Sequence, residues 1–166
     1  HLGRNLEQIN RIGEQREFID CLCRTVEENK IDLVLVAGDI YDTYNPSAAA
    51  EELFYEAMDR LNDNGKRAVV VIAGNHDNPE RLCAASPLVR KRGIILLGYP
   101  GSDAGAYLQE TQGSDAGIRI MDSGPGWLEL CLPDCEHHAV IITMPYPSES
   151  RLEEVLSQEA DEGALQ

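Results

Sequence analysis

The 166-residue sequence has no long hydrophobic run and little positive charge. No apolar stretch approaches the roughly 18 residues of a membrane-spanning helix, and the first residues do not resemble a signal peptide. The chain has 14 Lys and Arg against 29 Asp and Glu, which gives a formal net charge of −15. Proteins that grip DNA by themselves usually carry a basic face. We therefore expect a cytoplasmic protein that either acts on a small substrate or holds nucleic acid through a partner or another segment.

Paired cysteines are also absent. The five cysteines form no C-x-x-C pair, which argues against a disulfide framework or a zinc ribbon and fits reduced cytosolic thiols. Cys135 together with His137 and His138 could indicate a metal site, but a solvated turn is the preferred interpretation. The only marked basic cluster consists of Arg81, Arg90, Lys91 and Arg92.

The pattern of apolar residues predicts an α/β fold. The hydrophobic fraction of 43% is typical of a folded protein, and the length suffices for one domain with a full core. Runs at 31–37 (apolar except for Asp32), 68–73 and 94–97 are typical of buried strands. They alternate with predicted helices, one over 14–29 and others starting at 45–47 and 78–80. Such alternation favours a parallel sheet covered by helices.

Two of these helices carry an apolar stripe. In the first, Phe18, Leu22 and Val26 recur every four residues with Ile19 beside them, so this side should pack on the sheet. In the second, Ser47 is the expected N-cap. Its predicted buried residues are Leu53, Phe54, Ala57, Met58 and Leu61.

The composition changes after residue 100. Residues 101–126 are rich in Gly, Ser and Asp and contain the pentapeptide GSDAG twice. We expect turns around short antiparallel strands at 118–121, 127–132 and 139–143. A short amphipathic helix is predicted at 151–157, followed by a disordered acidic tail at 159–166.

Two polar loops follow the first two long strands: Gly38-Asp39-Ile40-Tyr41-Asp42 and Gly74-Asn75-His76-Asp77. The carboxyl ends of parallel strands meet at one edge of a sheet, where ligands bind in α/β folds. Oxygen donors from Asp39 and Asn75 with imidazole nitrogen nearby suit Mn²⁺, Fe or Zn²⁺. Two such ions would hold a phosphate and activate water for attack. The alternative is that these are ordinary turn residues.

The GDxxD and GNHD motifs resemble those of the calcineurin-like metallophosphoesterases. The flanking residues at 1–4, 14–16, 32–43 and 69–82 narrow the resemblance to the SbcD-type nuclease subunits of that superfamily. The resemblance reaches from residue 1 to about 99 and resumes near Met144-Pro145-Tyr146. It implies an α/β sandwich of two mixed sheets flanked by helices. It also implies two divalent metal ions, Mn²⁺ in the first place, with Fe or Zn²⁺ as alternatives.

The resemblance assigns roles to five residues. Asp39 would bridge both ions, His1 would bind one of them and Asn75 the other. His76 would act on the phosphate as a catalytic group, and the Asp77 carboxylate would orient its imidazole. Asp42 is at least as compatible with a turn or capping role. His1 could also be a mere terminus or a tag remnant.

The same family requires an Asp before residue 1 and further histidines later in the domain. We therefore expect residues 1–166 to be the N-terminal part of a nuclease domain that continues, with a cap domain, outside this sequence. By themselves these residues should be inactive.

For the intact protein the resemblance implies a DNA nuclease. It would act as a 3'-5' exonuclease on duplex ends and an endonuclease on single strands in DNA recombination and repair. DNA, an SbcC-like ATPase and a second copy in a homodimer are the implied partners. A phosphatase or phosphodiesterase using the same loops, and a non-catalytic scaffold module, remain alternatives.

Overall fold

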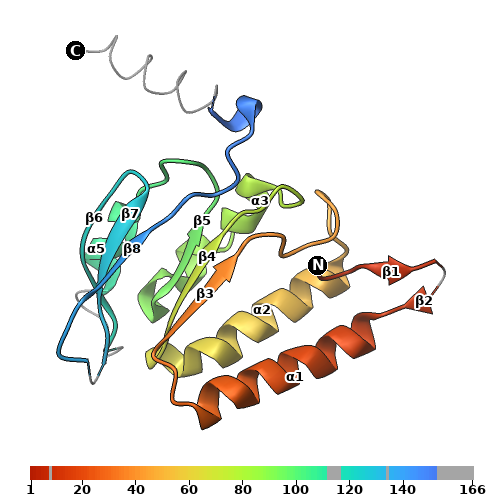
Figure 1. Cartoon of the computed structure of the whole chain (residues 1–166), viewed down its shortest axis with the longest axis horizontal. Coiled ribbons are helices and arrows are strands. Elements are labelled where there is room, and N and C mark those ends of the chain that lie inside the picture. Colours follow the sequence, from red (N-terminus) through yellow and green to blue (C-terminus); the bar gives the residue numbers. More distant parts are fainter. Residues whose placement is uncertain (8, 112–116, 134, 153–166) are drawn as a thin grey trace.

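The computed structural model describes residues 1–7, 9–111, 117–133 and 135–152. A parallel sheet with strand order β3-β4-β5 forms its centre (Figure 1). It consists of β3 (Leu33–Ala37), β4 (Ala68–Ile72) and β5 (Ile94–Leu97), the three strands predicted from apolar runs. Every residue of β5 is buried, as an apolar strand predicts. The edge strand β3 is only partly buried, and Leu35 is 57% exposed, so the prediction of a fully buried strand there is wrong.

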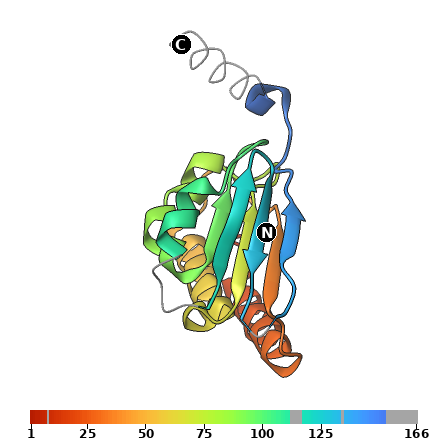
Figure 2. The same ribbon diagram turned by 90° about the vertical axis from the view of Figure 1, so that its left-hand side faces the viewer.

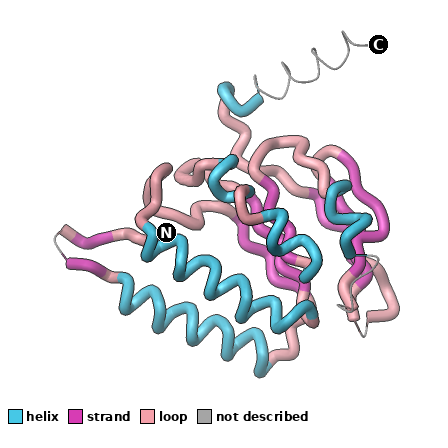
Figure 3. Tube along the Cα trace, turned by 180° about the vertical axis from the view of Figure 1, so that it is seen from behind, coloured by secondary structure: helices cyan, strands magenta, loops and turns pink. Residues whose placement is uncertain are grey.

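Helices α1 (Ile12–Glu28) and α2 (Ala48–Asn62) lie side by side on one face of the parallel sheet (Figures 1 and 3). As predicted, Ser47 caps α2, and its hydroxyl accepts a hydrogen bond from Ala50 N. All five residues of the predicted α2 stripe are buried. The helix ends where Asp63, at the start of η1 (Asp63–Gly65), takes a left-handed conformation.

The predicted buried face of α1 is confirmed for Ile19 and Val26, and Leu22 packs partly buried against the core, but the prediction is wrong for Phe18. Ile19, Cys23 and Val26 are buried, whereas Phe18 is 65% exposed. Phe18 is exposed because α1 packs on the neighbouring helix α2. Two ion pairs join the helices, Asp20 to Arg60 and Arg16 to Glu56. Packing on a helix selects a narrower stripe than packing on a sheet.

A second sheet, antiparallel and ordered β6-β7-β8, faces the first (Figure 2). Its strands are β6 (Arg119–Gly124), β7 (Trp127–Cys131) and β8 (Ala139–Ile142). A core cluster that includes Val70 and Ile95 of the first sheet and Leu128 and Leu130 of β7 joins the two sheets. The expected α/β sandwich is therefore confirmed, but neither of its two sheets is mixed: in the described strands one is parallel and the other antiparallel.

Helix α5 (Gly105–Thr111) replaces part of the turn region expected after residue 100. The Asp103 carboxylate accepts a hydrogen bond from the N–H of Gly105, the first residue of the helix. The buried Tyr107 hydroxyl then lies within hydrogen-bonding distance of Ser86 Oγ and of the backbone of Leu96. This long-range anchor has no local sequence signal. Most of the second GSDAG copy, most of the predicted helix 151–157 and the whole acidic tail lie outside the described residues.

The remaining elements are short. They are the hairpin β1 (Asn5–Leu6) and β2 (Ile9–Asn10), and, between β4 and β5, α3 (Pro79–Cys83), α4 (Ser86–Val89) and η2 (Arg90–Arg92). Asn78 caps α3 as its sequence indicates. Among the described helices, none combines the length and apolarity that crossing a membrane requires.

Candidate metal centre

The two polar loops touch each other directly after β3 and β4. A Cβ atom at Gly74 would lie only 2.2 Å from Asp39 N, and one at Gly38 would lie 2.8 Å from Gly74 Cα. Only glycine fits at both positions. Gly38 and Asp39 both have positive φ, 82° and 52°. The chain therefore turns sharply at the end of β3 and presents the Asp39 side chain beside the second loop.

The Asp77 carboxylate binds the first loop to the second. Its side chain is completely buried, and it accepts hydrogen bonds from Ile40 N (3.2 Å), Tyr41 N (2.9 Å) and Gly74 N (2.7 Å). A carboxylate accepting several backbone N–H bonds is strongly held in place. The buried Asp77 carboxylate thus fixes the position of the two loops relative to each other.

The N-terminal segment brings His1 to the same place. Leu2 pairs with the first loop: its N–H donates to Ile40 O at 2.7 Å, and its carbonyl accepts from Asp42 N at 3.0 Å. The Gln15 side chain of α1 accepts from Gly3 N at 2.9 Å and donates to Arg4 O at 3.2 Å. These bonds hold His1 against the end of β3.

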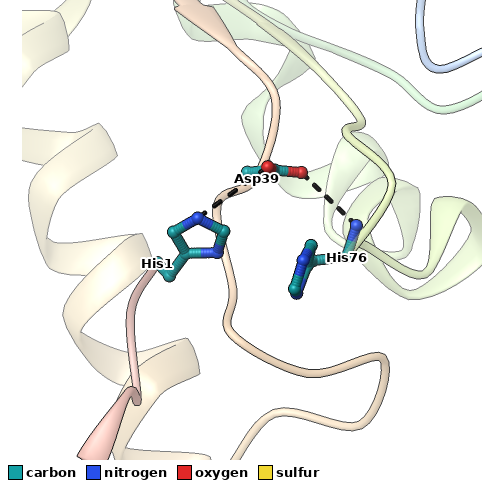
Figure 4. A group of neighbouring side chains, drawn as sticks. All are labelled: His1, Asp39 and His76. Atoms are coloured by element: carbon teal, nitrogen blue, oxygen red, sulfur yellow. Dashed lines mark hydrogen bonds and ion pairs between the residues drawn. The ribbon is translucent and has the colours of Figure 1, made fainter.

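His1, Asp39 and His76 converge at this edge of the parallel sheet (Figure 4). One ligand atom from each lies within 4.8 Å of those of the other two. His1 Nε2 is 3.8 Å from Asp39 Oδ2, and the two imidazole rings meet edge to face with centroids 4.8 Å apart. The backbone N–H of His76 donates to Asp39 Oδ1 at 3.3 Å. Three of the predicted site residues are therefore neighbours.

The His76 imidazole is oriented by Asp42 and not by Asp77, which corrects the expectation from the sequence. Its Nδ1 lies 2.8 Å from the backbone carbonyl of Asp42. Because a carbonyl only accepts, Nδ1 carries the proton, which leaves Nε2 available. Asp77 is buried under the loop backbones, where its oxygens are occupied. The spacing of the GDxxD motif singles out Asp42, but no sequence pattern reveals the use of its carbonyl.

The residues present fit a transition-metal ion. Imidazole nitrogens and a carboxylate oxygen are the donors that Mn²⁺, Fe and Zn²⁺ accept. Bonds of about 2.0–2.2 Å allow two ligand atoms on one ion to be at most about 4.4 Å apart, so a small side-chain movement suffices. Asn75, the other predicted ligand, is exposed on the second loop, and its side chain lines a neighbouring groove.

Arg151 supports the site, although no pattern in the sequence indicates this role. The side chain is buried, and its guanidinium donates to Gly74 O (3.0 Å) and Asp77 O (2.6 Å), the carbonyls on either side of Asn75 and His76. Tyr146 N also donates to Ala73 O at 2.9 Å. The segment after β8 thus supports the second loop. The resemblance near residues 144–146 is the only indication in the sequence that this segment approaches the site.

The predicted basic cluster is largely engaged with the protein itself. Arg81 forms two hydrogen bonds to the Glu51 carboxylate, Arg92 pairs with Asp59, and Arg90 lies over the Tyr107 ring at 5.5 Å. His138 pairs with Glu129 at 2.6 Å and His137 is exposed, so the described part of the chain fits a solvated turn there.

The chain is similar in sequence to known proteins. The calcineurin-like phosphoesterase family matches residues 3–132. The chain is 42% identical over 165 residues to the D subunit of the SbcCD nuclease of Bacillus subtilis. This alignment covers 99% of this chain and 36% of that protein. It is 35% identical over 99 residues to the corresponding protein of Rhodobacter capsulatus and 37% identical over 78 residues to that of Escherichia coli. The match to the Rhodobacter capsulatus protein covers 59% of this chain and 24% of that protein. The match to the Escherichia coli protein covers 47% of this chain and 19% of that protein.

The chain therefore spans about a third, or less, of the length of these relatives. The family match covers both loops and the whole parallel sheet that positions them. By its sequence and by the site that its fold builds, the chain belongs to the calcineurin-like phosphoesterase family.

Proposed function

We propose that this chain forms the N-terminal part of the catalytic domain of an SbcD-type DNA nuclease. The observation that carries the proposal is the convergence of His1, Asp39 and His76 at the edge of the parallel sheet, in a chain of this family. The similarity to the SbcCD nuclease protein of Bacillus subtilis over 99% of the chain supports the choice of a nuclease over a phosphatase.

In the proposed site His1, Asp39 and Asn75 hold two divalent ions together with ligands from outside these residues, and Mn²⁺ is the proposed metal. When bound, such ions neutralise charge on phosphoryl oxygens and acidify water. The protein contributes placement: Asp77 and Arg151 fix the loops, and the Asp42 carbonyl fixes the His76 ring. His76 Nε2 is then the nitrogen available to a phosphoryl oxygen or a leaving group.

The proposed setting is cytoplasmic DNA recombination and repair, with an SbcC-like ATPase as partner and a homodimer as the assembly. The names of the relatives, which are subunits of SbcCD nucleases, support the ATPase partner. The net charge of −15 supports it as well, because another surface must then attract the phosphates.

Replacing Asp39 by Asn tests the proposal in the natural full-length protein with its ATPase partner. Mn²⁺-dependent cleavage of linear duplex and single-stranded DNA should fall by at least about 10²-fold, because a charged ligand to the metal is lost. Asp42→Asn is the matched control, since it keeps the carbonyl that holds His76 and should retain most of the activity.

A substrate panel separates the alternatives. If the wild-type protein hydrolyses phosphomonoesters or cyclic nucleotides but not DNA, the nuclease proposal is wrong and the phosphatase or phosphodiesterase alternative holds. Absence of hydrolysis on every substrate, with Mn²⁺ and partner present, would favour a scaffold role.

A further inference from the structure

A groove of about 320 Å³ opens beside the candidate metal centre. Its walls include Tyr44, Asn75, Glu80, Tyr99, Tyr146 and Arg151. The volume lies at the lower end of the range for ligand sites, so it suits one small planar group and not a duplex.

The groove and the metal centre share the second loop. Asn75 lines the groove, and the next residue, His76, belongs to the metal centre, so the two sites use adjacent residues of one loop. Tyr44 comes two residues after Asp42, whose carbonyl holds the His76 ring. Tyr99 follows the carboxyl end of β5 by two residues. The groove therefore lies along the same sheet edge as the candidate ligands.

Three tyrosines contribute aromatic rings to the otherwise largely polar walls of this groove. Tyr44 is 53% exposed and Tyr146 is 46% exposed, and Tyr99 is half-buried. Exposed aromatic rings near a nuclease site are typical platforms for bases, because every base presents a π-face. Two serines and the Asn75 amide, also in the walls, offer hydrogen bonds to the edge of such a ring.

The charges of the groove disfavour a phosphate. Arg151 is the one cationic side chain in the described walls, and its guanidinium is engaged with the carbonyls of Gly74, Asp77 and Tyr146 at 3.0, 2.6 and 3.4 Å. The exposed Glu80 carboxylate would repel an anion. A neutral aromatic group with polar edges fits this combination better than a charged one.

We propose that this groove binds one unpaired nucleobase of the strand whose phosphate lies at the metal centre. This inference rests on the proposed nuclease function and specifies its substrate. A base inside the groove cannot stay paired, so duplex ends have to open before they are cut. The protein should therefore favour single strands and mismatched ends.

The test uses a single-stranded oligonucleotide with 2-aminopurine at the terminal position and the natural full-length protein with its partner. Stacking on tyrosine should quench the emission of the probe. Tyr44→Ala should abolish most of the quenching and weaken binding roughly 5- to 150-fold, the usual range for one stacked base. Tyr44→Phe, the matched control, keeps the ring and should behave like wild type.

An oligonucleotide that lacks the terminal base distinguishes the two proposals. Wild type, Tyr44→Ala and Tyr44→Phe should bind and cleave this abasic strand equally. If wild type cleaves DNA but neither quenches the probe nor loses affinity on Tyr44→Ala, the base site is refuted and the nuclease function stands. If quenching depends on the Tyr44 ring but no phosphodiester is ever cleaved, the base site stands and the nuclease function fails.

Discussion

At the scale of single residues, the Asp77 carboxylate illustrates how a motif residue can serve the fold and the site at once. It is fully buried and lies next to His76 in the sequence, yet its oxygens bind the backbone of both loops. The residue thus determines where Asp39 stands relative to the second loop.

Asp77→Ala should lower the free energy of unfolding by roughly 3 kcal/mol or more. The substitution leaves two buried N–H groups and one partly buried N–H group without an acceptor, and each buried group costs about 1–3 kcal/mol. Asp77→Asn keeps one acceptor oxygen and should cost less. Urea unfolding followed by circular dichroism measures both. The exposed Asp32 provides the control, and Asp77→Ala as stable as Asp32→Ala would contradict the role given to Asp77.

Asn75 and His76 should respond differently to excess metal in the full-length protein. Asn75→Ala weakens a proposed ligand, so metal content and cleavage should both fall, and added Mn²⁺ should restore part of the activity by mass action. His76→Gln should keep its metal and lose about 10²- to 10³-fold in rate, with no restoration.

Elemental analysis combined with single-turnover cleavage at several Mn²⁺ concentrations separates these effects. The ligand atoms of His76, His1 and Asp39 lie within 4.8 Å of one another, so a ligand role for His76 is a genuine competitor. If His76→Gln empties a metal site and Mn²⁺ restores its activity, His76 is a ligand and the catalytic role is wrong.

At the scale of elements, an ion pair joins α2 to α3, the helix that follows the second loop. Arg81 Nε lies 2.7 Å from Glu51 Oε1, and Arg81 Nη2 lies 3.1 Å from Oε2. The hydrogen bond from Arg81 lowers the pKa of Glu51. The ion pair joins α3, which follows the second loop, to α2, and its strength depends on the protonation state of Glu51.

Glu51→Gln should lower the Tm at neutral pH and have progressively less effect in acid. Because the folded pKa of Glu51 is lowered, its contribution is complete above the unfolded pKa of about 4.3 and disappears as the pH falls through the folded pKa. Thermal unfolding between pH 3 and 7 measures the difference in Tm from wild type. Glu52→Gln, an exposed neighbour on the same helix, should show no such trend. A Tm difference independent of pH would show that charge is not the cause.

At the scale of the whole molecule, acidic residues outnumber basic residues by 29 to 14. The net charge is −15, and several arginines of the helical layer pair with acidic partners. Two bound divalent ions would offset only a small part of this charge, and only locally. The fold thus presents a metal centre with little long-range attraction for DNA.

The isolated 166-residue chain should bind duplex DNA only at low ionic strength. Repulsion between the acidic surface and the phosphates outweighs the few available cations at physiological salt. Fluorescence anisotropy with a labelled duplex, titrated at several salt concentrations, measures this. Tight binding that resists salt would mean that a basic surface has been overlooked.

Local patterns in the sequence determined the three parallel strands, the caps at Ser47 and Asn78, and the two glycine-led loops, because strand apolarity, capping and tight turns depend on neighbouring residues. Resemblance to the family singled out His1, Asp39 and His76, and the structure brings them together. Tertiary structure alone decided that Cys23 of α1 is buried and Phe18 exposed, and it alone decided the helix anchored by Tyr107. It also decided how the Asp42 carbonyl and the Arg151 side chain hold the second loop. Each of these depends on atoms 11 to 77 residues apart in the chain, which come into contact only when the layers pack.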